Sequence, residues 1–256
     1  MAHLVEQNIL IKIFPAEMYL MCLKCLICFL TQIHLIKSLN GWDVRNVTDM
    51  SCMFQGAKSF NADISEWNVG NVKKMSYMFA GTHSFNQDIS RWDVSSVENM
   101  ASMFEKAKSF NQPLNEWDVR NAIFRTSMFK NAVNFNQPLD RWQFFEKELI
   151  KTSYHTYSIK GMFEGAISFN QDINSWDVSN VNDLRFLFKD VKSFNKPLDK
   201  WDVGRVQATN YLFDGATSFN QDISSWNLNE RYVYGPYEFR NCPIKEEYKP
   251  KVLRKK

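Results

Sequence analysis

The 256-residue sequence contains few cysteine, glycine and proline residues (5, 9 and 7), and it has no long uninterrupted apolar run. Five irregularly spaced cysteines do not form the pattern of a disulfide framework, which mildly favours a reducing compartment. The 31 basic and 28 acidic residues nearly balance, which argues against a protein built to neutralise many phosphates. Charged residues make up 23% and hydrophobic residues 45%, so wholesale disorder is excluded.

Aromatic residues are abundant instead, with 21 phenylalanines and 8 tryptophans. All the tryptophans are 25 residues apart except for one interval of 34: Trp42, Trp67, Trp92, Trp117, Trp142, Trp176, Trp201 and Trp226. Two phenylalanine series keep the same step: Phe54, Phe79, Phe104, Phe129, Phe163, Phe188 and Phe213, and Phe60, Phe85, Phe110, Phe135, Phe169, Phe194 and Phe219. The chain is therefore an internal repeat of 25 residues with nine residues inserted in one copy.

One copy, residues 64–88, shows the expected local structure. Ile64-x-x-Trp67-x-Val69 places alternate side chains on one face of an extended segment, which predicts a short strand. Val72, Met75, Met78 and Phe79 then follow a helical spacing over about two turns. Two residues after this phenylalanine, Gly, Asn and Asp predominate, as is typical where a helix ends in a left-handed residue. A single copy cannot bury its apolar side chains alone, so stacked copies are expected.

An asparagine follows the second phenylalanine in all seven copies: Asn61, Asn86, Asn111, Asn136, Asn170, Asn195 and Asn220. A solvated loop would accept other polar residues equally well, so an exclusive asparagine suggests a geometric role. Its amide carries both donors and acceptors and could bond to the turn backbone of a neighbouring copy. We expect these asparagines and the eight tryptophans to form structural ladders.

The repeats resemble a known family. The segments Trp92-Asp93-Val94-Ser95-Ser96-Val97 and Ser168-Phe169-Asn170-Gln171-Asp172-Ile173 are similar to the BspA-type surface-protein repeats of mycoplasma lipoproteins, other bacteria and some large DNA viruses. The Ile-x-x-Trp-x-Val stretch resembles the strand of leucine-rich repeats. The resemblance covers about residues 35–242. It implies surface or secreted proteins that bind other proteins and carry no catalytic residues.

The expected fold class is an α/β repeat solenoid. It would be a leucine-rich-repeat-like right-handed coil, with short parallel strands on one face and short helices on the other. The expected organisation has three parts. Residues 1–34 form an N-terminal apolar cap or anchor, residues 35–244 form about eight coils with an insertion within 143–160, and residues 245–256 form a solvated basic tail.

The role of the N-terminal segment is open between three readings. Residues 18–30 are apolar except for Lys24, which is too short for a confident membrane span. The segment could cap the stack, anchor the chain in a membrane through residues 18–36, or recruit a partner as an interaction helix. Cys22, Cys25 and Cys28 lack a fourth zinc ligand apart from His34, so no metal site is predicted.

Signals for catalysis are thin. His3, His34, His83 and His155 have no nucleophile at a suggestive spacing, and no phosphate-binding loop or hydrolase motif occurs. Acidic residues after the tryptophans, such as Asp93 and Asp118, are expected to accept bonds from the following turn; a weakly held Ca²⁺ is the alternative. In four successive copies the residue before tryptophan alternates in sign, which predicts an ion-pair ladder: Glu66, Arg91, Glu116 and Arg141. We predict no enzyme activity and no cofactor.

The insertion is the candidate contact site. Repeat insertions normally emerge as loops on one face, and aromatic residues there favour protein contact. The candidate binding residues are Phe144, Phe145, Tyr154, His155 and Tyr157. In the alternative, Phe144 and Phe145 fold back to fill the interrupted coil. Cys242 is expected to be a small buried residue of a shortened final coil.

These observations predict a non-catalytic scaffold that binds other proteins, with no nucleic-acid partner. Two rivals stay open: a membrane-tethered surface or adhesion protein, and an intracellular adaptor with an N-terminal recruiting helix. The sequence leaves the localisation open between the cell or virion surface and the cytoplasm, because no clear cleavable signal peptide is present.

Overall fold

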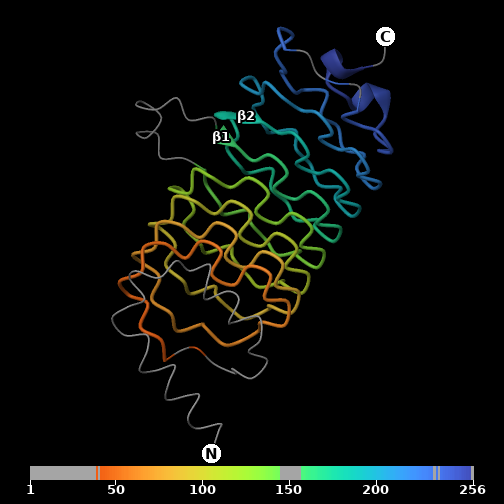
Figure 1. Cartoon of the computed structure of the whole chain (residues 1–256). Helices are drawn as coiled ribbons and strands as arrows, with labels where there is room; N and C mark the ends of the chain where they lie inside the picture. The colour runs from red at the N-terminus through yellow and green to blue at the C-terminus, as the bar shows by residue number, and fades with distance from the viewer. Residues whose placement is uncertain (1–38, 40, 145–156, 233–234, 236, 255–256) are drawn as a thin grey trace, which may run out of the picture.

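In the computed structural model, each copy of the repeat forms one winding of the chain, here called a coil. Successive coils stack along the long axis of an elongated molecule (Figure 1). The structure describes residues 39, 41–144, 157–232, 235 and 237–254. The predicted segments 1–34 and 18–36 therefore lie outside the described residues. No helix in the described part of the chain has the length and apolar character needed to cross a membrane.

Regular secondary structure is sparse in the described residues. The strands β1 (Tyr157–Ser158) and β2 (Val181–Asp183) pair in parallel, and two short 3₁₀ helices, η3 (Glu246–Tyr248) and η4 (Lys251–Leu253), lie near the C-terminus. Isolated parallel bridges join the other coils at equivalent positions: Asp49 with Lys74, Lys74 with Asn99, Asn99 with Phe124, and Asp183 with Ala208.

The parallel pairing lies at a different place from the predicted one. The strand was expected over residues 64–69 and their equivalents, but the described residues there form turns and irregular backbone with no strand pairing. The bridges occur instead directly before the column that contains Met75, as at Lys74 before Met75 and at Phe124 before Arg125. Period-two spacing of apolar residues identified an extended segment, but not whether its backbone would pair.

The short helices predicted over residues 72–79 and their equivalents are also absent from the described coils. Tyr77 and Gly81 have φ of 58° and 74°, and equivalent pairs of left-handed residues recur in the other coils. Two left-handed residues four positions apart interrupt a right-handed helix. The N–H groups of Met75, Tyr77 and Phe79 therefore donate to carbonyls of the next coil, at 2.8–2.9 Å, and not along their own segment.

The aromatic series form the core. In four pairs of neighbouring coils the tryptophan rings lie nearly parallel with centroids 6.1–6.4 Å apart, as for Trp67 and Trp92. Within a coil the two phenylalanines stack at about 4 Å, as Phe79 and Phe85 do at 4.1 Å, and Phe79 lies 5.6 Å from Phe104 of the next coil. These side chains are almost entirely buried in the inner coils.

Each indole N–H from Trp67 onward is satisfied in the same way. It donates to the backbone carbonyl of the residue that begins the tryptophan segment of the preceding coil, as Trp92 Nε1 does to Ile64 O at 3.2 Å. The same bond recurs in the six other coils: Trp67, Trp117, Trp142, Trp176, Trp201 and Trp226. A buried indole without such a partner would destabilise the fold, so this bond fixes the register of the stack.

Residues 245–254 do not form the solvated tail that their basic character predicts. The N–H of Ile223 donates to Tyr248 O at 2.9 Å, and Tyr248, Val252 and Leu253 pack against the hydrophobic core. Lys249 is buried and forms an ion pair with Glu246. The basic side chains of Lys245, Lys251 and Arg254 are exposed, while the apolar residues between them cover the last coil.

Candidate binding surface

The seven asparagines lie in one column along the stack. In the inner coils, the Oδ1 atom of each asparagine accepts the backbone N–H of the equivalent asparagine in the next coil, as Asn86 Oδ1 does from Asn111 N at 2.9 Å. The series is unbroken and ends at Lys245, whose N–H donates to Asn220 Oδ1: Asn61, Asn86, Asn111, Asn136, Asn170, Asn195 and Asn220. Glutamines that follow the asparagines add side-chain bonds between coils, as Gln112 Nε2 does to Asn86 O.

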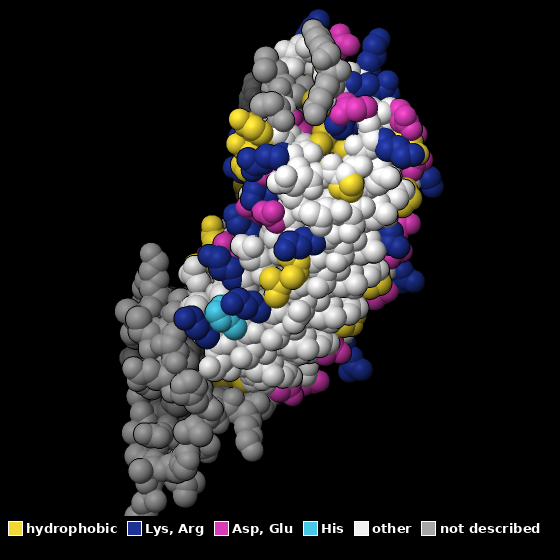
Figure 2. Space-filling model, turned by 90° about the vertical axis from the view of Figure 1, so that its right-hand side faces the viewer, with side chains coloured by type: hydrophobic (Ala, Val, Ile, Leu, Met, Phe, Trp, Pro, Cys, Tyr) yellow, Lys and Arg dark blue, Asp and Glu magenta, His cyan; other side chains and the backbone are white. Residues whose placement is uncertain are grey.

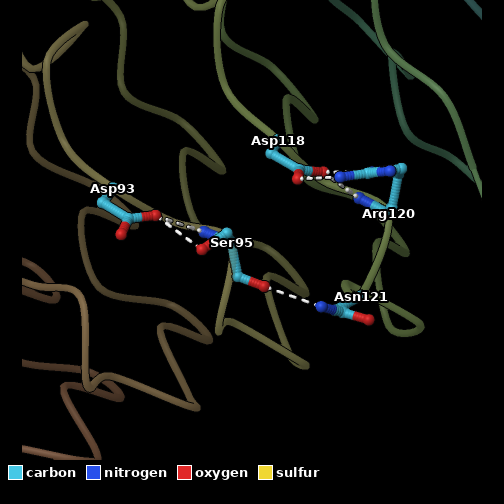
Figure 3. A network of polar contacts seen from close by, with 5 residues as sticks. All are labelled: Asp93, Ser95, Asp118, Arg120 and Asn121. Carbon is cyan, nitrogen blue, oxygen red and sulfur yellow. Dashed lines mark hydrogen bonds and ion pairs between the residues drawn. The ribbon is translucent and has the colours of Figure 1, made fainter.

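The carboxylates after the tryptophans close turns. Asp93 Oδ1 accepts bonds from the backbone N–H and hydroxyl of Ser95, and Asp118 forms a two-bond ion pair with Arg120 (Figure 3). Arg120 lowers the pKa of Asp118 through these hydrogen bonds. The described residues contain no group of three or more His, Cys, Asp or Glu side chains that could hold a metal ion. Asn121 joins this network to the preceding coil by donating to Ser95 O.

The same arrangement occurs in the first coil, where Arg45 forms two bonds to Asp43. These bonds hold the pKa of the exposed Asp43 carboxyl at about 2. Both side chains are accessible to water, so the pair contributes little to stability.

Charged side chains form two columns. In the first, Arg141 pairs with Glu116, one step of the alternating series of Glu66, Arg91, Glu116 and Arg141. The second column was not predicted from the sequence, although its charge alternates in sign through six coils: Glu105, Lys130, Glu164, Lys189, Asp214 and Arg240. Lys130 pairs with Glu164 at 2.9 Å, and Arg240 with Asp214 at 2.7 Å. On the face shown in Figure 2, charged side chains gather along the margins of a broad area of backbone and uncharged polar side chains.

The five candidate residues of the insertion have different positions in the structure. Phe144 is buried, and its ring packs edge-on against Trp176 with centroids 4.6 Å apart. It is therefore a core residue of the interrupted coil and is not accessible for contact. Phe145, Tyr154 and His155 lie outside the described residues, and Tyr157 belongs to β1.

A buried arginine also lies next to the insertion and was not identified from the sequence. Arg125 occupies the column of Met50, Met75 and Met100, and its guanidinium carbon lies 4.2 Å from the centroid of the Phe144 ring. Its Nη1 donates to Ala122 O. The signal available in the sequence was the single charged residue in a column that is apolar in most other coils.

Aromatic rings gather at one partly exposed position of the last coils. Phe186, Tyr211 and Tyr237, here called the aromatic column, stack with centroids 5.2 and 5.4 Å apart. Tyr237 is 44% exposed, and Arg240 lies 5.4 Å from its ring centroid. Phe186 and Tyr211 have φ near +60°, a conformation that bulky residues rarely adopt. The sequence held one indication of this column. The residue two positions before the first phenylalanine of each copy, such as Phe186 before Phe188, varies from coil to coil, whereas the core residues do not.

The remaining residues weighed for chemistry are isolated. His83 is the one histidine in the described part of the chain; burial and then the positive charges of Lys108 and Lys58 lower its pKa. Cys242 packs against the core, donates to Phe219 O, and has its pKa raised to about 11 by burial.

Stacked 25-residue copies, ladders of asparagine and tryptophan, and a continuous outer surface together define a repeat protein. A comparison with protein families identifies which one. The chain matches the family described as "Mycoplasma protein of unknown function, DUF285" over residues 25–142 and 148–242, and it belongs to that family. The gap between the two matched segments falls at the insertion. No curated protein matches the chain.

Proposed function

We propose that this protein is a non-catalytic scaffold that binds other proteins along the outer surface of a solenoid. The observation that carries the proposal is the contrast between columns. Core columns hold the same residue types in nearly every coil. One other position, which is buried at Ser102 and Gly161 and partly or fully exposed in the remaining coils, holds a different set: Cys52, Tyr77, Ser102, Ser127, Gly161, Phe186, Tyr211 and Tyr237. A rigid frame with a variable surface is typical of repeat proteins that bind partners.

We also propose that the solenoid is a right-handed coil related to BspA-type and leucine-rich repeats. It differs from the predicted form because the face opposite the strands carries no helices in the described coils. Support comes from the family assignment to a repeat family and from the coil-to-coil hydrogen bonds. Large exposed aromatic side chains such as Tyr77 and Tyr237 provide contact area on this surface, as side chains of this type do at protein interfaces.

Site-specific photo-crosslinking tests the proposal. A photo-reactive phenylalanine analogue placed at Tyr77, at Tyr237 or, as a control, at the exposed Lys73 would be activated in cells that naturally express the chain. We expect discrete crosslinked proteins at the aromatic positions and few at Lys73. Absence of specific crosslinked proteins at every outer position would contradict the proposal.

Two alternatives concern the N-terminal segment. If residues 18–36 tether the chain to a membrane as a surface or adhesion protein, deleting them should release the protein from the membrane fraction. If residues 1–40 instead recruit a partner to an intracellular adaptor, that fragment alone should capture a specific protein. If the shortened protein stays in the membrane fraction, the membrane tether is wrong. If the fragment of residues 1–40 captures no specific protein, the adaptor is wrong.

A further inference from the structure

One further column of basic side chains differs from the two charged columns above because its charges do not alternate in sign. Lys58, His83 and Lys108 hold the same position in three successive coils. The N–H of Ser84 donates to Lys58 O at 3.0 Å, so these two coils are direct neighbours. The N–H of Ser109 likewise donates to His83 O at 3.1 Å. Three basic side chains therefore follow one another at the spacing of the coils, about 4.8 Å.

This arrangement of like charges opposes the stability of the stack. Basic side chains at neighbouring positions repel one another. Burial, and then the positive charges of Lys108 and Lys58, lower the pKa of His83, so the three side chains lie within electrostatic reach. Among the described residues, no carboxylate forms an ion pair with Lys58 or Lys108, whereas Lys130 pairs with Glu164 in the alternating column. Stability alone therefore does not explain the basic column.

The next coils carry apolar side chains at the same position. Val133 and Ile167 follow Lys108, and Lys192 follows Ile167. The N–H of Ser193 donates to Ile167 O at 3.1 Å, so the neighbour relation continues. Ile167 is 39% exposed, and Lys192 is exposed. The six residues are here called the outer strip: Lys58, His83, Lys108, Val133, Ile167 and Lys192.

We propose that the outer strip binds an acidic segment of a partner protein, which places carboxylates beside the basic residues and apolar side chains over Ile167. Lys58, Lys108 and Lys192 are exposed, so a partner reaches their ammonium groups from solvent without a cavity. Five steps between coils span about 24 Å, the length of about seven residues of extended chain. The inference rests on the proposed scaffold function and specifies the chemistry of one of its partners.

Charge complementarity supports this occupant. Carboxylates of the partner would remove the repulsion between Lys58, His83 and Lys108, which no described carboxylate of the chain relieves by an ion pair. The same segment would take the exposed apolar surface of Ile167 out of water. Binding thus compensates for two features that are unfavourable in the free protein.

The composition of the outer strip favours a polypeptide over a nucleic acid. Proteins that bind single-stranded nucleic acids combine a cationic groove with aromatic side chains on which bases stack. The outer strip has no phenylalanine, tyrosine or tryptophan, and two of its six positions are aliphatic. A phosphate backbone gains nothing from Val133 and Ile167, whereas a protein segment can place apolar side chains against them.

Binding of fluorescently labelled peptides to the full-length chain, measured by anisotropy, tests the assignment. The probe is a peptide of about eight residues with glutamates towards both ends and two leucines between them. In one comparison peptide glutamine replaces each glutamate, and in another serine replaces each leucine. Polyuridine RNA and vesicles of equimolar phosphatidylcholine and phosphatidylserine represent other anionic ligands. We expect the probe to bind most tightly, by about tenfold over the glutamine peptide, and to weaken as salt is added.

Variants of exposed residues locate the binding. The double substitution Lys58→Gln and Lys108→Gln should weaken binding of the probe about tenfold, the contribution of two exposed ion pairs. Ile167→Ser should weaken the probe about fivefold and leave the serine peptide unchanged. Lys73→Gln with Lys200→Gln is the matched control. It removes two exposed lysines of other columns and should change affinity by less than about twofold.

The unfolding temperature separates binding from a structural role. Because the substitutions Lys58→Gln and Lys108→Gln relieve repulsion, the double variant should unfold at the wild-type temperature or slightly above it. A lower unfolding temperature would show that the lysines stabilise the stack and would contradict a binding role.

Three binding results would overturn the inference. They are equal affinity for the probe and the glutamine peptide, wild-type affinity of the double variant, and tighter binding of the RNA or the vesicles than of the probe. Failure of this inference is distinguishable from failure of the scaffold proposal. Specific crosslinked proteins at Tyr77 would still support a scaffold, whereas their absence at every outer position would not.

Discussion

At the scale of single residues, left-handed backbone positions decide how each coil turns. One such column contains Gly56, Gly81, Gly165 and Gly215, interrupted by Lys106, Asn131, Asp190 and Asn241. A Cβ at Gly215 would lie 2.3 Å from Asp190 Oδ1, whereas a Cβ at Gly56 would have no atom within 4 Å. From Asn131 onward the column therefore alternates glycine with a larger residue, where the coils approach closely.

The substitution Gly56→Ala should cost only the left-handed strain, about 1–2 kcal/mol. Gly215→Ala should lower the free energy of unfolding by about 1 kcal/mol more, because Asp190 must move and its contact with Lys189 is disturbed. Urea unfolding of both variants measures the difference. Equal losses for the two variants would show that the close contact with Asp190 is unimportant.

The asparagine ladder makes a second prediction. Asn111→Ala removes the acceptor for Asn136 N and Gln137 Nε2, and it should destabilise the protein by about 1–2 kcal/mol. Asn111→Asp keeps an acceptor oxygen and should lose less than about 1 kcal/mol. The midpoint of thermal unfolding, followed by tryptophan fluorescence, reports both. If aspartate is as harmful as alanine, the donor half of the amide matters more than the acceptor.

A buried carboxyl makes stability depend on pH. Burial raises the pKa of Glu238, whose Oε1 bonds to the hydroxyl of Thr209. A raised folded-state pKa means that the folded chain binds the proton more tightly than the unfolded chain. The contribution to stability is then complete below the unfolded value of 4.5 and is lost as the pH rises through the folded pKa.

Glu238→Gln should accordingly be more stable than the wild type at pH 7, with a flatter dependence of stability on pH above 4.5. Urea unfolding at several pH values tests this. An unchanged dependence on pH would mean that another group dominates the titration.

At the scale of the element, one coil is held mainly by its neighbours. In the methionine segment, alternate N–H groups donate to the next coil, as Met75, Tyr77 and Phe79 do. The sequence pattern of Val72, Met75, Met78 and Phe79 predicts a helix because it identifies which side chains are buried. The pattern does not identify the carbonyl groups to which the backbone N–H groups donate. The left-handed conformation of Tyr77 could not be predicted either, since tyrosine rarely adopts it.

The insertion interrupts the chain without interrupting the stack. Ser127 N donates to Lys160 O and Phe129 N donates to Met162 O, so the coils on either side of it pair directly. Deleting nine residues within 145–156 would restore the regular spacing. We expect the unfolding temperature to change by only about a few degrees, because loop length has a weak effect on stability.

The same deletion tests the insertion as a contact site. Its remaining candidates are Phe145, Tyr154, His155 and Tyr157, and a partner that uses them should crosslink to the full chain but not to the shortened one. If the shortened chain retains every partner, the contact assignment to the insertion is wrong.

At the scale of the whole molecule, the repeat makes the protein divisible into equivalent units. Deleting residues 93–117 removes one 25-residue copy and joins Trp92 to Asp118, which restores the original sequence pattern at the junction. The shortened chain should unfold cooperatively. The slope of its unfolding free energy against urea concentration should be about one tenth smaller, because the chain buries proportionately less surface.

A deletion of residues 94–117 is the matched control. It removes 24 residues and shifts the aromatic and asparagine columns by one position against the preceding coils. This variant should lose the cooperative transition in circular dichroism. Equal stability of the two deletions would mean that register between coils does not determine the fold.

The sequence by itself determined the length of the repeat, the position of the insertion, and which aromatic and asparagine residues share a column, because equal spacing places equivalent residues at equivalent points. Only the tertiary structure decided where the coils pair, that their turns are not helical, that Phe144 is buried and that residues 245–254 cover the last coil. These features depend on hydrogen bonds and packing between residues in different coils. Spacing within one copy carries no information about such contacts.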